Sequence, residues 1–358
     1  MVSGNANPSL TTPLTTLLHI HHPILLAGMA HTATAPLASA VTNAGGLGVI
    51  GGLGYTPPQL RAMIQELKSL LSSPSLPFGV DLALPAVGGT ARKTNHDYTK
   101  GLLHELVDVI VDEGTTLFVS AVGVPPTPVV ERLHAGGVVV MNMVGHPKHA
   151  VKAFDAGMDI VCAQGGEGGG HTGEIPAHLL VPACVDVARR YRPPMLKGAH
   201  GMVVAAGGIY DGRGLAASLN LGAVGVWVGT RFVASEEAGC SRAHKDAVVE
   251  AGWGDTTRTL VVSGRPLRVR RNGYVAEWER RGERVRELTE KGVVPMELDM
   301  EEDREVDFPH LMGVVAASID AIKPAQAIVE DMVVEAVECL RVAYGYVGAC
   351  GQRGESKL

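Results

Sequence analysis

The sequence predicts an α/β protein built on a TIM (β/α)8 barrel, with a smaller segment inserted after the eighth strand. Eight short apolar runs, spread over about two hundred residues, alternate with amphipathic stretches of helical length. Several of these runs are continuously apolar, which is typical of parallel strands that are buried on both faces. An open, doubly wound sheet is the main alternative, but a count of eight strand–helix units favours a closed barrel.

Helical stretches separate the eight expected strands, and none is expected directly after the last strand. The expected strands are Pro23–Ala27, Leu47–Ile50, Phe78–Leu82, Thr116–Ala121, Val138–Met143, Asp159–Ala163, Met202–Ala206 and Ala223–Val228. The expected helices lie near Pro36–Ala44, Pro57–Leu71, Tyr98–Glu113, Pro126–Ala135, Pro147–Ala156, Ala177–Tyr191 and Arg213–Leu221. The second helix has a clear start, because Thr56 can cap it and two prolines follow in its first turn.

The barrel pattern stops after Thr230. Residues 234–310 are expected to form an inserted substrate or lid segment over the top of the barrel, with a helix near Glu236–Ala251. Its basic run Arg265–Arg271 is interpreted as the solvated face of a hairpin. The stretch Pro324–Ala343 has helical apolar spacing and is expected to close the barrel.

The predicted domain organisation has three parts. Residues 1–233 and 311–350 form the barrel, residues 234–310 form the insertion, and residues 351–358 form a flexible tail. The tail ends in Ser356-Lys357-Leu358, a tripeptide that a peroxisomal import receptor reads at a free carboxyl terminus. We therefore expect a peroxisomal location, with the cytoplasm as the alternative, and a compartment that handles oxidation.

Composition excludes several classes of function. The net charge of −6 and the lack of a basic stripe argue against binding of nucleic acid. No membrane span is expected, and the polar start MVSGNANPSLTTPLTTLL does not have the form of a secretory signal. The five cysteines have neither zinc-ligand nor redox spacing, which indicates a reducing compartment. The cluster His19, His21 and His22 has no carboxylate beside it, so no metal site is expected there.

Glycines follow nearly every expected strand, at the end where barrel enzymes place their active sites. Gly207-Gly208 and Gly229-Thr230 follow the seventh and eighth strands, where this fold commonly binds phosphate. The helix that begins near Gly212 is expected to add its positive end to that site. A phosphate-bearing ligand is therefore expected. Since neither a Walker loop nor a dinucleotide fingerprint is present, that ligand is expected to be a mononucleotide.

The sixth strand leads into CAQGGEGGGHTGE, a glycine-rich stretch that favours neither a helix nor a strand. Glycines there allow the backbone to come close to a flat ligand without an intervening Cβ atom. The imidazole of His171 titrates near neutral pH and can accept a proton from a carbon acid. Glu167 could orient the loop or pair with a cation, and both roles remain open.

Four ordered stretches resemble the nitronate monooxygenase (2-nitropropane dioxygenase-like) family of FMN-dependent TIM barrels. They are PILLAGMAHTATAPLASAVTNAGGLGVIGG, FGVDL, DIVCAQGGEGGGHTGE and VVAAGGIYDGRGLAASLNLGAVGVWVGTRF, and the later SGRPLRVRRN also resembles the family's inserted segment. The resemblance implies that FMN binds at the barrel mouth and that His171 is the catalytic base. It implies the cofactor-binding residues Gly28, Met29, Asp81, Gln164, Gly169, Gly207, Gly208, Gly229 and Thr230, with the phosphate on the last four.

The chain also departs from the family pattern. Many relatives have Asn in place of Asp81, and a carboxylate that faced the FMN phosphate would be unfavourable, so Asp81 is expected to contact another part of the cofactor or to be bridged by water. His31 and His146 stand near strand ends, and either could share or replace the basic role of His171. The glutamine that many relatives have near Met312-Gly313 is missing.

Three functions are weighed. The first is oxidation of alkyl nitronates with O2 to a carbonyl compound and nitrite. The second is an NAD(P)H-dependent FMN reductase that acts on quinones or enoyl thioesters. The third is a flavin-binding protein without turnover. The expected partners are a small-molecule substrate and O2, with the import receptor and a second copy of the chain, as a homodimer, as further expectations.

Overall fold

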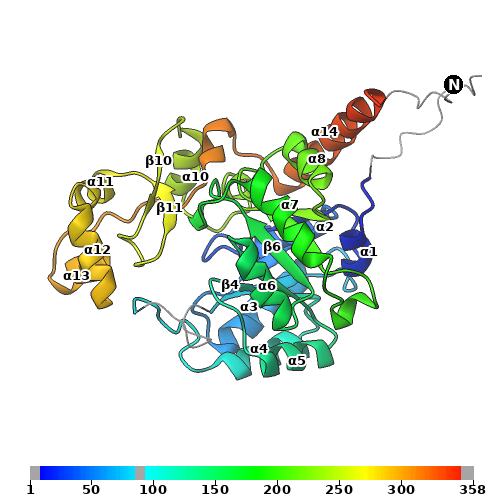
Figure 1. Ribbon diagram of the computed structural model, residues 1–358, viewed down its shortest axis with the longest axis horizontal. Helices are drawn as coiled ribbons and strands as arrows, with labels where there is room; N and C mark the ends of the chain where they lie inside the picture. The colour runs from blue at the N-terminus through cyan, green and yellow to red at the C-terminus, as the bar shows by residue number, and fades with distance from the viewer. Residues whose placement is uncertain (1–8, 85–92, 348–358) are drawn as a thin grey trace, which may run out of the picture.

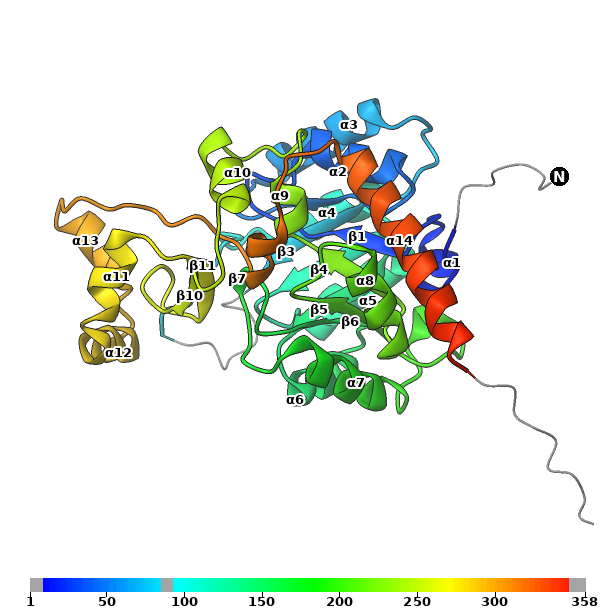
Figure 2. The same ribbon diagram turned by 90° about the horizontal axis from the view of Figure 1, so that it is seen from above.

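The computed structural model describes residues 9–84 and 93–347, and eight parallel strands in this part of the chain form one sheet that curls into a barrel (Figures 1 and 2). The strands are β1 (Ile24–Leu26), β2 (Val49–Gly51), β3 (Gly79–Ala83), β4 (Leu117–Ala121), β5 (Val139–Val144), β6 (Ile160–Gln164), β8 (Met202–Ala206) and β9 (Gly225–Val228). Their order in the sheet is β1-β9-β8-β6-β5-β4-β3-β2.

The gap between the two ends of this sheet is closed at Leu47, just before β2. The amide of Leu26 donates to the carbonyl oxygen of Leu47 at 2.9 Å, and the amide of Leu47 donates to that of Ile24 at 2.9 Å. A parallel bridge between Leu25 and Leu47 results. The predicted TIM barrel is therefore confirmed, and the open doubly wound sheet is excluded.

Helices surround the barrel (Figure 2). They are α2 (Ala35–Asn43), α3 (Pro57–Leu70), α4 (Leu103–Asp112), α5 (Thr127–Ala135), α6 (Pro147–Asp155), α7 (Ala177–Ala188), α8 (Gly212–Asn220) and the long α14 (Ala325–Gly345). As expected, α14 completes the ring, because it packs between α8 and α2. Residues on the outer face of the sheet, such as Phe118 and Val226, pack under the helices, whereas Val119 and Trp227 point into the barrel. Burial on both faces explains the continuous apolar runs.

The short helix α1 (Pro13–Leu18) closes the amino-terminal end of the barrel and was not expected. Thr12 caps it and Pro13 occupies its first turn. Leu14 and Leu18, four residues apart, lie on one face and pack with the residues inside the barrel. A six-residue helix gives too little periodicity to be recognised from the sequence.

Several predicted boundaries were wrong. The helix expected from Tyr98 begins at Leu103, and the one expected over Glu236–Ala251 is the shorter α10 (Arg242–Val249), which Ser241 caps. A short helix, α9 (Thr230–Val233), follows β9 where none was expected. The glycine stretch contains a two-residue strand, β7 (Gly170–His171), because β11 (Leu267–Arg270) provides a partner that local sequence does not reveal.

The segment between α10 and residue 310 lies beside the barrel mouth (Figures 1 and 2). Its strands β10 (Thr256–Thr259) and β11 form a hairpin, and β7 adds to β11 as the third strand. Beyond the hairpin, α11 (Gly273–Glu279), α12 (Gly282–Lys291) and α13 (Pro295–Glu301) surround a small apolar cluster that includes Trp278 and Leu288. We retain the division at residues 234 and 310 as a proposal.

The basic run in this hairpin was predicted to be a solvated face, and that prediction was wrong. Leu267 and Val269 of β11 are buried, and the Nε of Arg268 donates to the carbonyl oxygen of Gly166 at 3.1 Å. Arg265 is partly buried and reaches the barrel side of the molecule. A hairpin is present, but its arginines hold it against the barrel loops because β11 is the central strand of its sheet.

The tripeptide Ser356-Lys357-Leu358 lies outside the described residues, and the peroxisomal location stays a prediction. Within residues 9–84 and 93–347, no helix is both long and apolar enough to cross a membrane.

One buried carboxylate supports the amino-terminal end of the barrel. Asp159 is fully buried, and its Oδ2 accepts hydrogen bonds from the amide of Val140 at 2.9 Å and from His134 Nε2 at 2.9 Å.

We expect Asp159→Ala to lower the free energy of unfolding by about 2 kcal/mol, since a buried amide would lose its acceptor. Urea denaturation checks this. The control Asp108→Ala removes only an exposed ion pair with Arg132 and should change stability by less than about 0.5 kcal/mol.

Candidate active site

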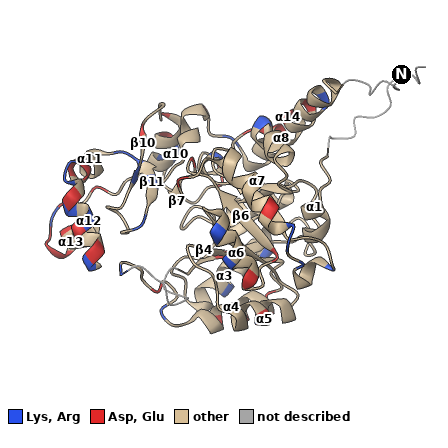
Figure 3. Ribbon diagram, viewed as in Figure 1, with Lys and Arg blue, Asp and Glu red and all other residues tan. Residues whose placement is uncertain are grey.

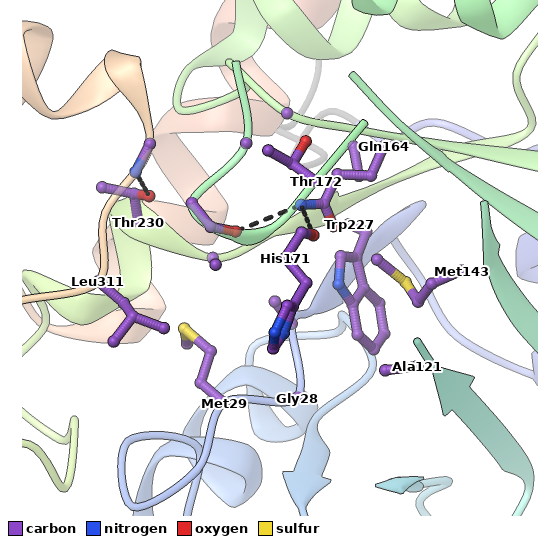
Figure 4. Close-up of a pocket in the computed structure, with 18 of the residues that line it drawn as sticks. Gly28, Met29, Ala121, Met143, Gln164, His171, Thr172, Trp227, Thr230 and Leu311 are labelled. Carbon is purple, nitrogen blue, oxygen red and sulfur yellow. Dashed lines mark hydrogen bonds between the residues drawn. The ribbon is translucent and has the colours of Figure 1, made fainter. Parts of the chain in front are cut away.

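A cavity of about 840 Å³ lies at the carboxyl ends of the barrel strands, where the sequence placed the chemistry. His171 and all nine residues predicted to bind the cofactor line it, namely Gly28, Met29, Asp81, Gln164, Gly169, Gly207, Gly208, Gly229 and Thr230. The fold therefore brings together residues that are spread over two hundred positions of the sequence. Figure 4 shows His171 and Met29 pointing into this cavity.

The loop after β6 is fixed by side chains at its base. Gln164 Nε2 donates to the carbonyl oxygens of Gly169 at 3.2 Å and His171 at 3.0 Å (Figure 4). The hydroxyl of Thr172 donates to the carbonyl oxygen of Gly165 at 2.7 Å. Gln164 was expected to approach a bound ring, and the structure adds that its amide holds the loop that carries His171.

Glu167 has a structural role in the same loop. Both of its carboxylate oxygens accept from the amide of Ala177, at 3.2 and 3.1 Å, which is the first residue of α7. A carboxylate at the amino terminus of a helix is favourable because the helix dipole is positive there. Of the two roles left open by the sequence, orientation of the loop is the one that the described contacts support.

Close backbone packing explains two of the loop glycines. A Cβ atom on Gly169 would lie 2.6 Å from the carbonyl carbon of Met312, and one on Gly173 would lie 2.5 Å from the carbonyl oxygen of Gly145. Both distances are well inside van der Waals contact. The loop can therefore pass between β5 and the segment before α14 only with glycine at these positions.

His171 belongs to β7, which pairs with the hairpin strand β11, and its ring contacts the hairpin. Its Nε2 lies 3.0 Å from the hydroxyl oxygen of Ser263, in the connection between β10 and β11. Burial in the cavity wall, with a smaller contribution from the positive charge of Arg265, lowers the pKa of His171 to about 4. The imidazole is therefore uncharged at neutral pH and able to accept a proton.

Ser263 and Arg265 were not recognised as site residues from the sequence. Both lie in SGRPLRVRRN, which was noted for a resemblance and for a basic run interpreted as a solvated face, and Ser263 contacts His171 only because β7 pairs with β11. Arg265 lines the cavity and donates to Asn95 Oδ1 at 2.7 Å and to the carbonyl oxygen of Val122 at 3.2 Å. Because both residues are far from His171 along the chain, their proximity to it could not be predicted from local sequence.

Asp81 is a buried acid at the floor of the cavity. Its side chain lies against Gly28, where a Cβ atom would stand 2.3 Å from the Asp81 Cβ. Desolvation raises the pKa of Asp81 well above its usual value, so the carboxyl is protonated over a wider pH range than a solvated aspartate. Its Oδ1 is buried and has no hydrogen-bond partner among the described residues.

Apolar side chains complete the floor. Trp227 of β9, Met143 of β5 and Ala121 of β4 lie next to one another in Figure 4. None of the three was predicted as a site residue, because apolar residues at strand ends cannot be distinguished from ordinary core residues by pattern. Together they offer a flat surface for an apolar ring.

The other two histidines considered as bases differ in position. His31 lines the cavity and has a positive φ of 58°. His146 is not among the lining residues, and its Nδ1 accepts from the amide of Lys148 at 3.1 Å at the start of α6. The hypothesis that His146 shares the basic role was therefore wrong, whereas His149, three residues later, does line the cavity.

The expected contribution of α8 to a phosphate site was also wrong. The first amides of this helix already have acidic partners, because Gly212 N donates to Glu335 Oε2 at 2.7 Å and Gly214 N donates to Asp211 Oδ1 at 2.9 Å. The end of strand β8, just before this helix, does line the cavity. Gly207 and Gly208 both have positive φ, at 92° and 74°, and they line the cavity with the amino end of α9.

The described residues thus offer a flat apolar floor, a rim of backbone amides and an uncharged histidine. Within them, no cluster of His, Cys, Asp and Glu side chains could hold a metal ion. This arrangement suits an organic cofactor with a phosphate and a planar ring.

The family model described as nitronate monooxygenase matches residues 11–335. The chain is 31% identical to the (3aS,4S,5R,7aS)-5-hydroxy-7a-methyl-1-oxo-octahydro-1H-indene-4-carboxyl-CoA dehydrogenase of Mycobacterium tuberculosis, over 94% of this chain and 99% of that one. It is 33% identical to a probable nitronate monooxygenase of Staphylococcus saprophyticus, over 74% and 80%. A crystal structure of nitroalkane oxidase from Streptomyces ansochromogenes superimposes with a TM-score of 0.75 and 25% identity, over 93% and 100%.

The buried acid gives a prediction about pH. The raised pKa of Asp81 means that its contribution to stability is complete below the unfolded-state value near 3.8 and is lost as pH rises through the folded-state value. We expect flavin-free Asp81→Asn to be more stable than the unaltered protein at pH 7, and the gain to disappear toward pH 4. Urea denaturation at several pH values measures the difference.

The matched control is Asp186→Asn, which neutralises an exposed aspartate on α7. That change should alter stability little at either pH. A gain for Asp81→Asn that did not depend on pH would contradict the explanation by burial of a charge.

Proposed function

The chain belongs to the nitronate monooxygenase family of oxidoreductases, and we propose that it oxidises alkyl nitronates with O2 to a carbonyl compound and nitrite, with FMN as its bound cofactor. The observation that carries this proposal is the convergence of His171 and the glycine-rich strand ends on one cavity. The likeness to a solved nitroalkane oxidase, which covers 93% of the chain, supports a nitro compound as the substrate.

The residues present fit FMN. Gly207, Gly208, Gly229 and Thr230 would hold its phosphate, because they offer backbone amides at the ends of β8 and β9. Gly28, Met29 and Gly169 would lie against the ring, and the unpartnered Oδ1 of Asp81 could exchange a hydrogen bond with a polar ring atom. When bound, the flavin would supply the redox chemistry of the reaction.

His171 would act on the substrate's proton. Its Nε2 lies 3.0 Å from the hydroxyl oxygen of Ser263, a contact that would hold the ring in place. The uncharged imidazole would take a proton from the α-carbon of a nitroalkane.

The second candidate is a reductase that uses NAD(P)H on quinones or enoyl thioesters. The observation that favours it is the 31% identity to a carboxyl-CoA dehydrogenase over nearly the full length of both chains. A cavity of about 840 Å³ is also at the large end of small-molecule sites, so it leaves room for a bulky substrate.

We expect His171→Ala to lower kcat/KM for a nitroalkane about a hundredfold or more, because a positioned general base commonly contributes a factor of that size. Oxygen uptake by the purified holoenzyme measures this, and the flavin spectrum shows that the variant still holds the cofactor. The control His178→Ala changes an exposed histidine on α7. Equal, measurable rates for His171→Ala and the unaltered enzyme would remove His171 from the mechanism. If neither protein took up oxygen when substrate was added, the result would indicate a flavin-binding protein without turnover.

Anaerobic reduction separates the two candidate reactions. We expect the flavin absorbance of the holoenzyme to bleach when an alkyl nitronate is added and to stay nearly unchanged over the same time with NADH or NADPH. A stopped-flow spectrophotometer records both. Rapid bleaching by either nicotinamide, with none by the nitronate, would reject oxidation of nitronates in favour of the reductase.

A further inference from the structure

Arg265 stands at the tip of the β10–β11 connection and reaches across the cavity mouth. Its guanidinium donates to Asn95, which lies between β3 and α4, and to the carbonyl oxygen of Val122, which follows β4. Two residues earlier in the same connection, Ser263 contacts the His171 ring. One short turn of the insertion therefore touches both sides of the cavity and places a cation between them.

The barrel side of this contact has an unusual backbone. Val122 follows β4 and has a φ of 69°, in the left-handed region that β-branched residues rarely adopt. The amide of Gly123 donates to the carbonyl oxygen of Ala121 at 2.8 Å, which closes a tight turn around Val122. Such strain persists only where surrounding contacts enforce it, and here the turn presents a carbonyl oxygen to Arg265.

Arg265 contributes a positive charge to the cavity wall, and burial favours the uncharged forms of several other ionisable groups there. Burial lowers the pKa of His149, His171 and His244, and Arg265 itself lowers the first two further. Burial raises the pKa of Asp81, which favours its neutral form. Arg258 lies 3.0 Å from Glu174, so these two charges offset each other. Basic residues line this side of the insertion, along β11 (Figure 3).

We propose that Arg265 is a specificity-determining residue that binds a negatively charged, planar group of the substrate beside His171. A guanidinium matches a planar pair of oxygen atoms through two parallel hydrogen bonds. The nitronate group, with one negative charge shared by two oxygens on nitrogen, has this shape. The inference rests on the proposed function, and it adds that the enzyme prefers the anion to the neutral nitroalkane because a cation meets the group that carries the charge.

Nitrate is the probe, because it is planar, singly charged and unreactive. Isothermal titration of the holoenzyme with sodium nitrate is expected to show binding that R265Q weakens roughly ten- to hundredfold, since hydrogen bonds to a charged group are lost. R265K keeps the charge and should recover part of the affinity. The control R284Q removes an exposed arginine on α12 that pairs with Glu287, and it should bind nitrate as the unaltered enzyme does.

A second measurement needs no variant. Guanidinium does not titrate in the accessible range, so nitrate affinity of the unaltered holoenzyme should stay constant from about pH 6 to pH 9. Affinity that fell as pH rose would assign the anion to a histidine instead and overturn the inference. Equal binding by R265Q, or no binding by the unaltered enzyme, would also overturn it.

Turnover separates this inference from the proposed function. With an alkyl nitronate, KM should rise in R265Q by a factor similar to the loss of nitrate affinity. Flavin content and melting temperature establish that R265Q is folded. If nitrate binding depends on Arg265 but no nitronate is oxidised, the proposed function fails and the anion site stands. If the enzyme oxidises nitronates but R265Q leaves both nitrate binding and KM unchanged, the proposed function stands and the anion site fails.

Discussion

The backbone pairing of Gly170 and His171 with β11 is the contact on which the site depends. Two residues of the loop after β6 leave the barrel and become the edge strand of the insertion's sheet. This pairing sets the position of His171 relative to Ser263 and carries the connection to Arg265 across the cavity. The loop that carries His171 and the insertion are consequently one structural unit, although His171 and Ser263 are 92 residues apart along the chain.

The barrel was predictable because its signals are local. Continuous apolar runs and capped amphipathic stretches specify strands and helices without reference to distant residues, and glycines at nearly every strand end mark the face where ligands bind. His171 and the glycines around it could be found for that reason. The boundaries were less accurate, as at Leu103, because neighbouring contacts rather than periodicity decide where a helix begins.

What sequence reasoning missed depends on long-range contacts. Ser263 and Arg265 acquire a role only when β11 pairs with β7, and α1 is recognisable only once the open end of a barrel is there to receive Leu14. The acidic partners of the first amides of α8 show that distant residues can also remove a site that local sequence suggests. A glycine-rich helix start suggested an anion site, but Glu335 arrives from the last helix of the chain to take the amide of Gly212.

The tight packing of the loop glycines has a consequence for how such an enzyme can change. At Gly169 and Gly173 the space for a side chain is already filled by backbone atoms, so almost any replacement would disturb the loop itself. Substitutions at these two glycines are therefore not expected to produce new substrate preferences. In the connection from Ser263 to Arg265, Gly264 is confined in the same way, because a Cβ atom on it would lie 2.5 Å from the Thr94 Cβ. The side chain of Arg265, by contrast, lines the cavity and can be altered while the barrel stays intact. Divergence of substrate preference should concentrate at Arg265, with the glycine-rich walls of the cavity left unchanged.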